Sequence, residues 1–219
     1  MSVRIAPLLW GLATALTLIT TACHSPQQMA IKAAEGNPQA QFDYACYLLK
    51  NKHCTPEQQE EAILLLIKST DGGSQHAPAT LGMCYSIGVG TAPDLAQARS
   101  YLQIASDRNH PRAQLMLAHI YANGIGAPAN PAKAAEEIRY AAMQGSPLAA
   151  LLMFYCFYDA FGVVQDTSLA LGWLQNAADF GSDEATELLN LAENAEKSQN
   201  FQQKVDLLRK KLDFFPKKR

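Results

Sequence analysis

Residues 77–90 read APATLGMCYSIGVG, and residues 113–126 read AQLMLAHIYANGIG, 36 positions later. In both stretches an alanine is followed, at the same spacings, by a leucine, a small residue, a tyrosine and a Gly-x-Gly pair. The pattern extends outward as a small residue and an alanine four positions apart, at Gly36/Ala40, Gly73/Ala77, Asn109/Ala113, Gly145/Ala149 and Gly181/Ala185. A second series of alanines runs in phase with it, at Ala62, Ala98, Ala134 and Ala170. Self-similarity at a period of roughly 20 to 50 residues is typical of a solenoid, in which each unit stacks on its neighbours.

Each unit contains signals for two helices. Asn37-Pro38 and Ser146-Pro147 place a capping residue before a proline, which starts the first helix of a unit. Glycines such as those in Gly88-Val89-Gly90 end that helix, and Asp94 caps the second one. The Gly-x-Gly turns are not phosphate loops, because no strand precedes them and no Gly-Lys-Ser/Thr follows. The sequence therefore predicts an all-α protein, an α/α solenoid of antiparallel helix pairs with 36-residue repeats.

These residues resemble the Sel-one-like repeat, a relative of the tetratricopeptide repeat. The segments 77–105 and 113–142 carry the pattern well, whereas 149–178 has Phe157 in place of the tyrosine and lacks one glycine. Segment 40–69 lacks the glycine turn. Nearly every matching residue serves packing, so the resemblance specifies a fold and says little about a ligand.

The N-terminus has the outline of a lipoprotein signal peptide. Arg4 precedes an uncharged apolar run that ends at Ala22-Cys23, and the run is too short for a spanning helix. We expect cleavage after residue 22 and lipidation of Cys23, with an ordinary signal peptide or an N-terminal anchor as the alternatives. His24 after the cysteine favours sorting to the outer membrane over the inner one, by resemblance to enterobacterial lipoproteins. The predicted location is the periplasmic face of the envelope.

Four segments follow from these signals. Residues 1–22 form the signal peptide, and 23–35 form a short tether with an N-terminal helical cap. Residues 36–181 hold four helix-pair repeats, and 182–219 hold a fifth first helix with a basic C-terminal capping helix. Val205, Leu208 and Leu212 give that last helix an apolar stripe. Its lysines and arginines are expected to form a solvated outer face, as terminal units of solenoids require.

Four cysteines remain after Cys23. Cys46 and Cys54 flank the one irregular turn, where the two alanines of the unit are 22 residues apart instead of 21, and a disulfide between them is predicted. A metal site from Cys46, His53 and Cys54 lacks a fourth ligand. Cys84 and Cys156 stand at equivalent positions two units apart, which is too far for a disulfide, and are interpreted as buried small hydrophobes.

The tetratricopeptide resemblance implies a concave groove lined by the first helices of the units. It implies that the groove residues recur at fixed positions relative to the first alanine. The set is Phe42, His76, Met83, Arg112, Leu115, His119, Asn123, Leu148, Leu151, Tyr155, Tyr158 and Asp159. Exposed tyrosines beside leucines are typical of interaction sites. Two outcomes stay open for them, namely exposure to a partner or coverage by neighbouring helices or by the capping helix.

Catalysis has little support in the sequence. His119 has no serine or cysteine partner in its own unit, so no acyl-transfer site is predicted, and no cofactor is implied. A net charge of -2 without a basic face argues against nucleic acid. The first hypothesis is a non-enzymatic, lipid-anchored periplasmic adaptor that holds an envelope protein or peptide in the groove. The alternatives are a binder, or slow hydrolase, of cell wall glycan or peptide fragments, and an inhibitor of an envelope enzyme.

Overall fold

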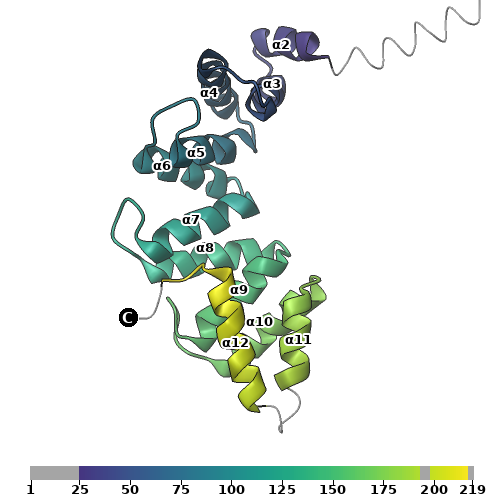
Figure 1. Ribbon diagram of the computed structural model, residues 1–219, viewed down its shortest axis with the longest axis vertical. Coiled ribbons are helices and arrows are strands. Elements are labelled where there is room, and N and C mark those ends of the chain that lie inside the picture. The colour runs from purple at the N-terminus through teal and green to yellow at the C-terminus, as the bar shows by residue number, and fades with distance from the viewer. Residues whose placement is uncertain (1–24, 193–197, 217–219) are drawn as a thin grey trace, which may run out of the picture. The chain divides into compact units, whose positions relative to one another are not determined.

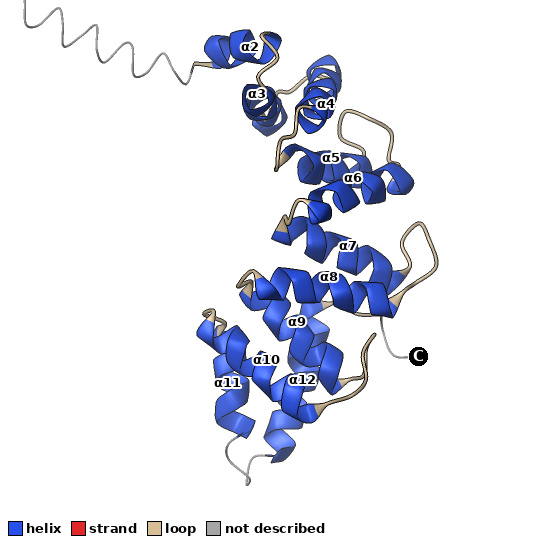
Figure 2. Cartoon of the chain, turned by 180° about the vertical axis from the view of Figure 1, so that it is seen from behind, coloured by secondary structure: helices blue, strands red, loops and turns tan. Residues whose placement is uncertain are grey.

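The computed structural model describes residues 25–192 and 198–216. All regular elements in these residues are helices, which confirms the predicted all-α class (Figures 1 and 2). The chain divides into two compact units, residues 1–93 and 94–219. We describe each unit by itself.

The N-terminal unit contains four described helices: α2 (Pro26–Ala34), α3 (Pro38–Lys50), α4 (Pro56–Asp71) and α5 (Ala77–Ile87). Asn37 caps α3 by accepting a hydrogen bond from the Ala40 amide at 2.9 Å, and Thr55 and Gln58 form a reciprocal capping box at the start of α4. Successive helices pack on one another, α2 on α3, α3 on α4 and α4 on α5. Packing between sequence neighbours is the arrangement that a repeat array requires.

The C-terminal unit contains α6 (Leu95–Asp107), α7 (Pro111–Asn123), α8 (Pro131–Met143), α9 (Pro147–Tyr158), α10 (Thr167–Asp179), α11 (Asp183–Ala192) and α12 (Ser198–Leu212). The predicted caps Asp94 and Ser146 each accept a hydrogen bond from the first turn of a helix, and Asn130 and Asp166 do the same at the equivalent positions of later repeats. Here too each helix from α6 to α11 packs on the next one, and α11 packs on α12.

Both alanine series lie in the core, which explains why they repeat. Helices that approach to about 8–10 Å cannot carry bulky side chains at their crossings. The buried positions are Ala40, Ala77, Ala113, Ala149 and Ala185 in the first helices, Ala62, Ala98, Ala134 and Ala170 in the second ones, and Leu66, Leu102, Ile138 and Leu174 one turn further on. The repeat pattern is therefore a pattern of interhelical contacts.

The second glycine of the Gly-x-Gly turn has a packing role besides its positive φ. At Gly90 a Cβ atom would overlap the backbone carbonyl of Gln59, at the start of α4. At Gly162 it would overlap the carbonyl of Pro131, at the start of α8. The turn that ends the first helix of one repeat thus lies against the second helix of the preceding repeat, where only glycine fits.

Candidate partner-binding groove

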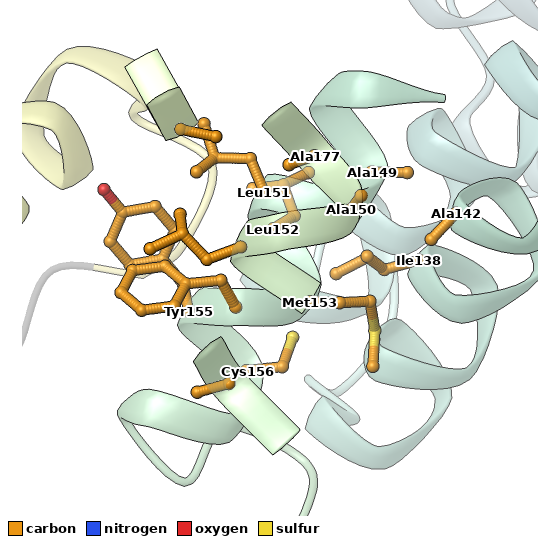
Figure 3. Close-up of a cluster of buried hydrophobic side chains, with 14 of the residues drawn as sticks. Ile138, Ala142, Ala149, Ala150, Leu151, Leu152, Met153, Tyr155, Cys156 and Ala177 are labelled. Atoms are coloured by element: carbon orange, nitrogen blue, oxygen red, sulfur yellow. The ribbon is translucent and has the colours of Figure 1, made fainter. Parts of the chain in front are cut away.

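Helix α9 is buried on every side, although it is a first helix and was expected to line a groove. Every residue from 149 to 156 is buried, and α8 and α10 pack against two of its sides (Figure 3). The predicted groove residues Leu151 and Tyr155 are only 3% and 0% exposed. Of the two outcomes left open by the sequence, the structure shows coverage at these positions.

The capping helix α12 provides this cover. Its predicted apolar stripe points at α9, with Val205 and Leu208 buried in the same core cluster as Leu151 and Tyr155. The Tyr155 hydroxyl donates a hydrogen bond to the Val205 carbonyl at 3.3 Å. Burial, followed by the nearby charge of Asp159, raises the pKa of Tyr155 well above its ordinary value, so this side chain is a neutral core residue.

Polar contacts surround this apolar seam. The Tyr158 hydroxyl donates to Gln202 Oε1 at 2.5 Å. Arg209 pairs with Asp159 at 3.4 Å, and their side chains are only 19% and 13% exposed. Lys204 pairs with Glu187 of α11 at 2.7 Å. Lys211 pairs with Glu184 of α11 at 3.8 Å, so three of the basic residues that were expected to be solvated bind acidic groups of the chain.

The segment after α12 continues across the unit to α7. Asn123 Nδ2 donates to the Phe214 carbonyl oxygen at 3.0 Å, and His119 Nδ1 lies 3.3 Å from the same oxygen. The His119 and Phe214 rings meet edge to face at 5.4 Å. Phe215 is buried, with ring centroids 6.3 Å from Tyr155 and 4.8 Å from Phe161. Residues 213–215 therefore join the predicted groove residues of α7 to those of α9.

The other predicted groove residues of this unit lie at the edge of the covered area. Leu115 is half-buried against the core cluster, whereas Arg112 is exposed. Leu148, at the start of α9, is 43% exposed. The capping helix thus covers the middle of the predicted groove and leaves Arg112 and Leu148 accessible.

The N-terminal unit keeps its predicted residues more open. Phe42 and Met83 are half-buried and His76 is exposed, and the Phe42 and His76 rings lie 5.8 Å apart. Phe42 lines a cleft of about 770 Å³ on α2 and α3. Its other lining residues include Met29, Lys32, Asp43, Cys46, Tyr47 and Lys50. This cleft combines an apolar surface with charges of both signs.

The sequence matches a known family model over most of the described helices. The Sel1 repeat model matches residues 38–74, 80–110, 111–146 and 147–182. The chain belongs to the Sel1 repeat family. Sel1 repeats are scaffolds for protein–protein interaction, and this chain has that scaffold. The resemblance inferred from the sequence is confirmed.

Solved structures share the Sel1 repeat fold. A protective antigen of uropathogenic Escherichia coli strains that displays an SLR fold is 24% identical, with a TM-score of 0.71, over 84% of this chain and 41% of its own. A Sel1 repeat protein from Oxalobacter formigenes is 27% identical, with a TM-score of 0.66, over 75% of this chain and 47% of its own. This chain therefore spans less than half the length of either protein.

A shorter protein shows the same likeness. Helicobacter pylori cysteine rich protein B is 20% identical, with a TM-score of 0.50, over 63% of this chain and 99% of its own. No protein of curated function matches the sequence significantly. These likenesses establish the Sel1 solenoid, and the groove residues must be argued from this chain alone.

The cysteines of the Sel1 repeats differ in surroundings. Cys46 and Cys54 are free thiols, so the predicted disulfide is not present in the structure. The irregular loop is held by hydrogen bonds instead, from the His53 amide to the Asn51 side chain and within the Thr55 capping box. Cys84 and Cys156 are buried as predicted, and burial raises the pKa of Cys84 to about 11 and that of Cys156 to about 12.

The sequence did not indicate a polar cleft of about 530 Å³ between the second helices α6 and α8 of two Sel1 repeats. Its floor holds Glu137, which is buried and accepts a hydrogen bond from the Ser106 hydroxyl at 2.6 Å. Burial raises the pKa of Glu137, and the Ser106 hydrogen bond opposes that rise. The available signal was Glu137 directly before Ile138, the apolar residue that follows the repeat alanine Ala134 by four positions.

Two further sequence interpretations concern the N-terminal signal peptide and a metal site. Residues 1–22 and Cys23 lie outside the described residues, and none of the described helices is long and apolar enough to cross a membrane. Within the described part of the chain, no three His, Cys, Asp or Glu side chains gather as metal ligands would.

Proposed function

We propose that this chain is a non-enzymatic adaptor, lipid-anchored at Cys23 on the periplasmic face of the envelope, that binds an envelope protein or peptide through the first helices of its Sel1 repeats. We place it at the outer membrane. The carrying observation is the open cleft on α2 and α3, about 770 Å³ in volume, in a chain whose family scaffold mediates protein interaction. Half-buried Phe42 beside Lys32 and Asp43 offers an apolar anchor with flanking charges.

A catalytic role has little support. The two buried thiols are held protonated by their surroundings, with the pKa of Cys156 raised to about 12, so neither is an activated nucleophile. Binding of cell wall fragments, the alternative function, would use His119 and Asp159 in one pocket. Both are engaged by the chain's own C-terminal segment, His119 by Phe214 and Asp159 by Arg209.

In-cell photocrosslinking tests the proposal. A photoreactive residue replaces Phe42 or His76, and Glu60 on the exposed side of α4 serves as the control position. One discrete protein crosslinked from Phe42 or His76 but not from Glu60 is expected, and its identity would show whether the partner is an envelope enzyme. Equal products from all three positions, or no protein product, would contradict the adaptor function.

Metabolic labelling with palmitate tests the lipid anchor separately. The chain is expected to take up the label, globomycin should block the later cleavage of its signal peptide, and the Cys23→Ser variant serves as the control. Label that persists in the Cys23→Ser variant would contradict lipidation at this residue.

A further inference from the structure

Helix α12 does not contact the rest of its unit as the other second helices do. Helix α8 packs between α7 and α9, and helix α10 packs between α9 and α11. Helix α12 packs on α11 but also bonds to α9 through Tyr155 and Tyr158, and the residues after it reach α7. The C-terminal segment therefore lies on the face that the resemblance assigns to a ligand.

The contacts of this segment are those of a bound peptide. Phe214 offers its main-chain carbonyl to Asn123 and its ring to His119. Phe215 places its ring in an aromatic pocket formed by Tyr155 and Phe161. Extended segments are recognised through main-chain hydrogen bonds together with pockets for their side chains. The groove between α7 and α9 is thus built for two consecutive aromatic residues.

The attachment of residues 213–216 is weaker than that of α12. Val205 and Leu208 fix the helix in the core, together with the Arg209–Asp159 pair. Beyond Leu212 the chain is held by the rings of Phe214 and Phe215 and by the Phe214 carbonyl. Release of residues 213–216 would break none of these helix contacts.

We propose that the groove between α7 and α9 takes from a partner an extended segment with two adjacent aromatic side chains, and that residues 213–216 occupy it in cis until such a segment displaces them. This inference rests on the proposed adaptor function. A tethered segment acts at an effective concentration of roughly millimolar, so it excludes weak ligands. The apparent affinity for a partner equals the affinity of the open groove multiplied by the fraction of molecules in which the groove is open.

The test uses the full chain and its own sequence as the ligand. A fluorescein-labelled peptide of residues 211–216, KLDFFP, is titrated with the unaltered chain and with a Phe214→Ala/Phe215→Ala variant, and anisotropy is measured. The variant is expected to bind the peptide at least about tenfold more tightly than the unaltered chain. Adding Asn123→Ala to the variant should weaken binding, and a peptide with both phenylalanines changed to alanine should not bind.

Equal binding by the two chains, or binding by neither, would overturn the inference. If circular dichroism shows that the double variant has lost its helices, Phe214→Ala alone is used, because Phe214 is only half-buried. It should still tighten binding at least about threefold, and an unchanged affinity would count against cis occupancy. Sedimentation gives a further check. If the unaltered chain is a dimer and the Phe214→Ala/Phe215→Ala variant is a monomer, residues 213–216 bind a second copy of the chain, and the inference of cis occupancy is overturned. The assay needs no partner, so it can fail while the photocrosslinking succeeds.

Discussion

Helices α3 and α9 are both first helices of Sel1 repeats, yet they meet different surroundings. Phe42 of α3 and Leu151 of α9 occupy the same repeat position, as do Cys46 and Tyr155. The two residues of α3 are half-buried and line an open cleft, whereas those of α9 are covered by α12. A repeat position therefore fixes the direction of a side chain but not its exposure, which depends on what the non-repeated ends of the chain place over it.

Thiol modification should show the largest difference between the two helices. Burial raises the pKa of Cys156 from 9.0 to about 12, which lowers its thiolate fraction at pH 8 by about a thousandfold. Cys46 lines the cleft of α3; burial raises the pKa of this thiol too, but the side chain is only half-buried, and iodoacetamide should modify it at least about tenfold faster. Peptide mapping by mass spectrometry measures both rates. Comparable rates would contradict the covered state of α9, and modification of Cys46 and Cys54 only after reduction would reveal the predicted disulfide.

Truncation of the core tyrosine should have the next largest effect. Tyr155→Ala removes a fully buried ring, and we expect it to lower the free energy of unfolding by about 3–5 kcal/mol. Phe42→Ala, at the open cleft, should cost about 1 kcal/mol. Urea denaturation followed by circular dichroism compares the two. A cost for Tyr155→Ala as small as that for Phe42→Ala would show that α12 does not cover α9 in solution.

The ion pair at the edge of the cover gives an intermediate test. Arg209→Ala leaves the Asp159 carboxylate largely buried without its cation, and we expect a loss of about 2 kcal/mol. Lys210→Ala, at the adjacent exposed position, should change stability by less than about 0.5 kcal/mol. Thermal melts of both variants measure the difference. Equal melting temperatures would mean that the Arg209 pair adds nothing to the docking of α12.

The end of α9 is suited to a stabilising substitution. Ala160 has a φ of 57°, at the position where the preceding repeat has Gly124. Ala160→Gly should relieve this strain and raise the free energy of unfolding by about 0.5–1 kcal/mol. The reverse change, Gly124→Ala, should destabilise the fold, because its Cβ would lie 2.9 Å from the Ala129 amide nitrogen. A destabilised Ala160→Gly variant would contradict the left-handed backbone at this turn.

The smallest effect concerns Glu137, away from α12. Its pKa is raised on folding by burial, so the stability tied to its proton is present at low pH and is lost as the pH rises through the folded pKa. Glu137→Gln keeps an acceptor for Ser106 and should raise the melting temperature at pH 8 by about 1–2 °C, with no gain at pH 3.5. Glu60→Gln, at an exposed position, is the control. A gain at both pH values would exclude titration as the cause.

Much of the fold could be predicted because the repeat signals are local. A proline after a capping residue starts α3 and α9, and alanine spacing follows from contacts between neighbouring helices. The candidate groove was located less well. The resemblance assigned His119, Asn123 and Tyr155 to one face, and in the structure all three contact one segment. That the segment is residues 213–215 of the same chain could not be read from any period.

The sequence by itself determined the Sel1 repeats, their two helices and the small residues at their crossings, because each repeat packs on its immediate neighbours and so leaves a regular spacing. Only the tertiary structure decided that α12 covers α9 and that Phe214 and Phe215 reach α7 and Phe161. The stripe of Val205, Leu208 and Leu212 shows that the helix must bury one face. Burial is non-directional, so the surface that accepts this face is chosen by shape and by polar partners such as Asp159, which come together only in the folded chain.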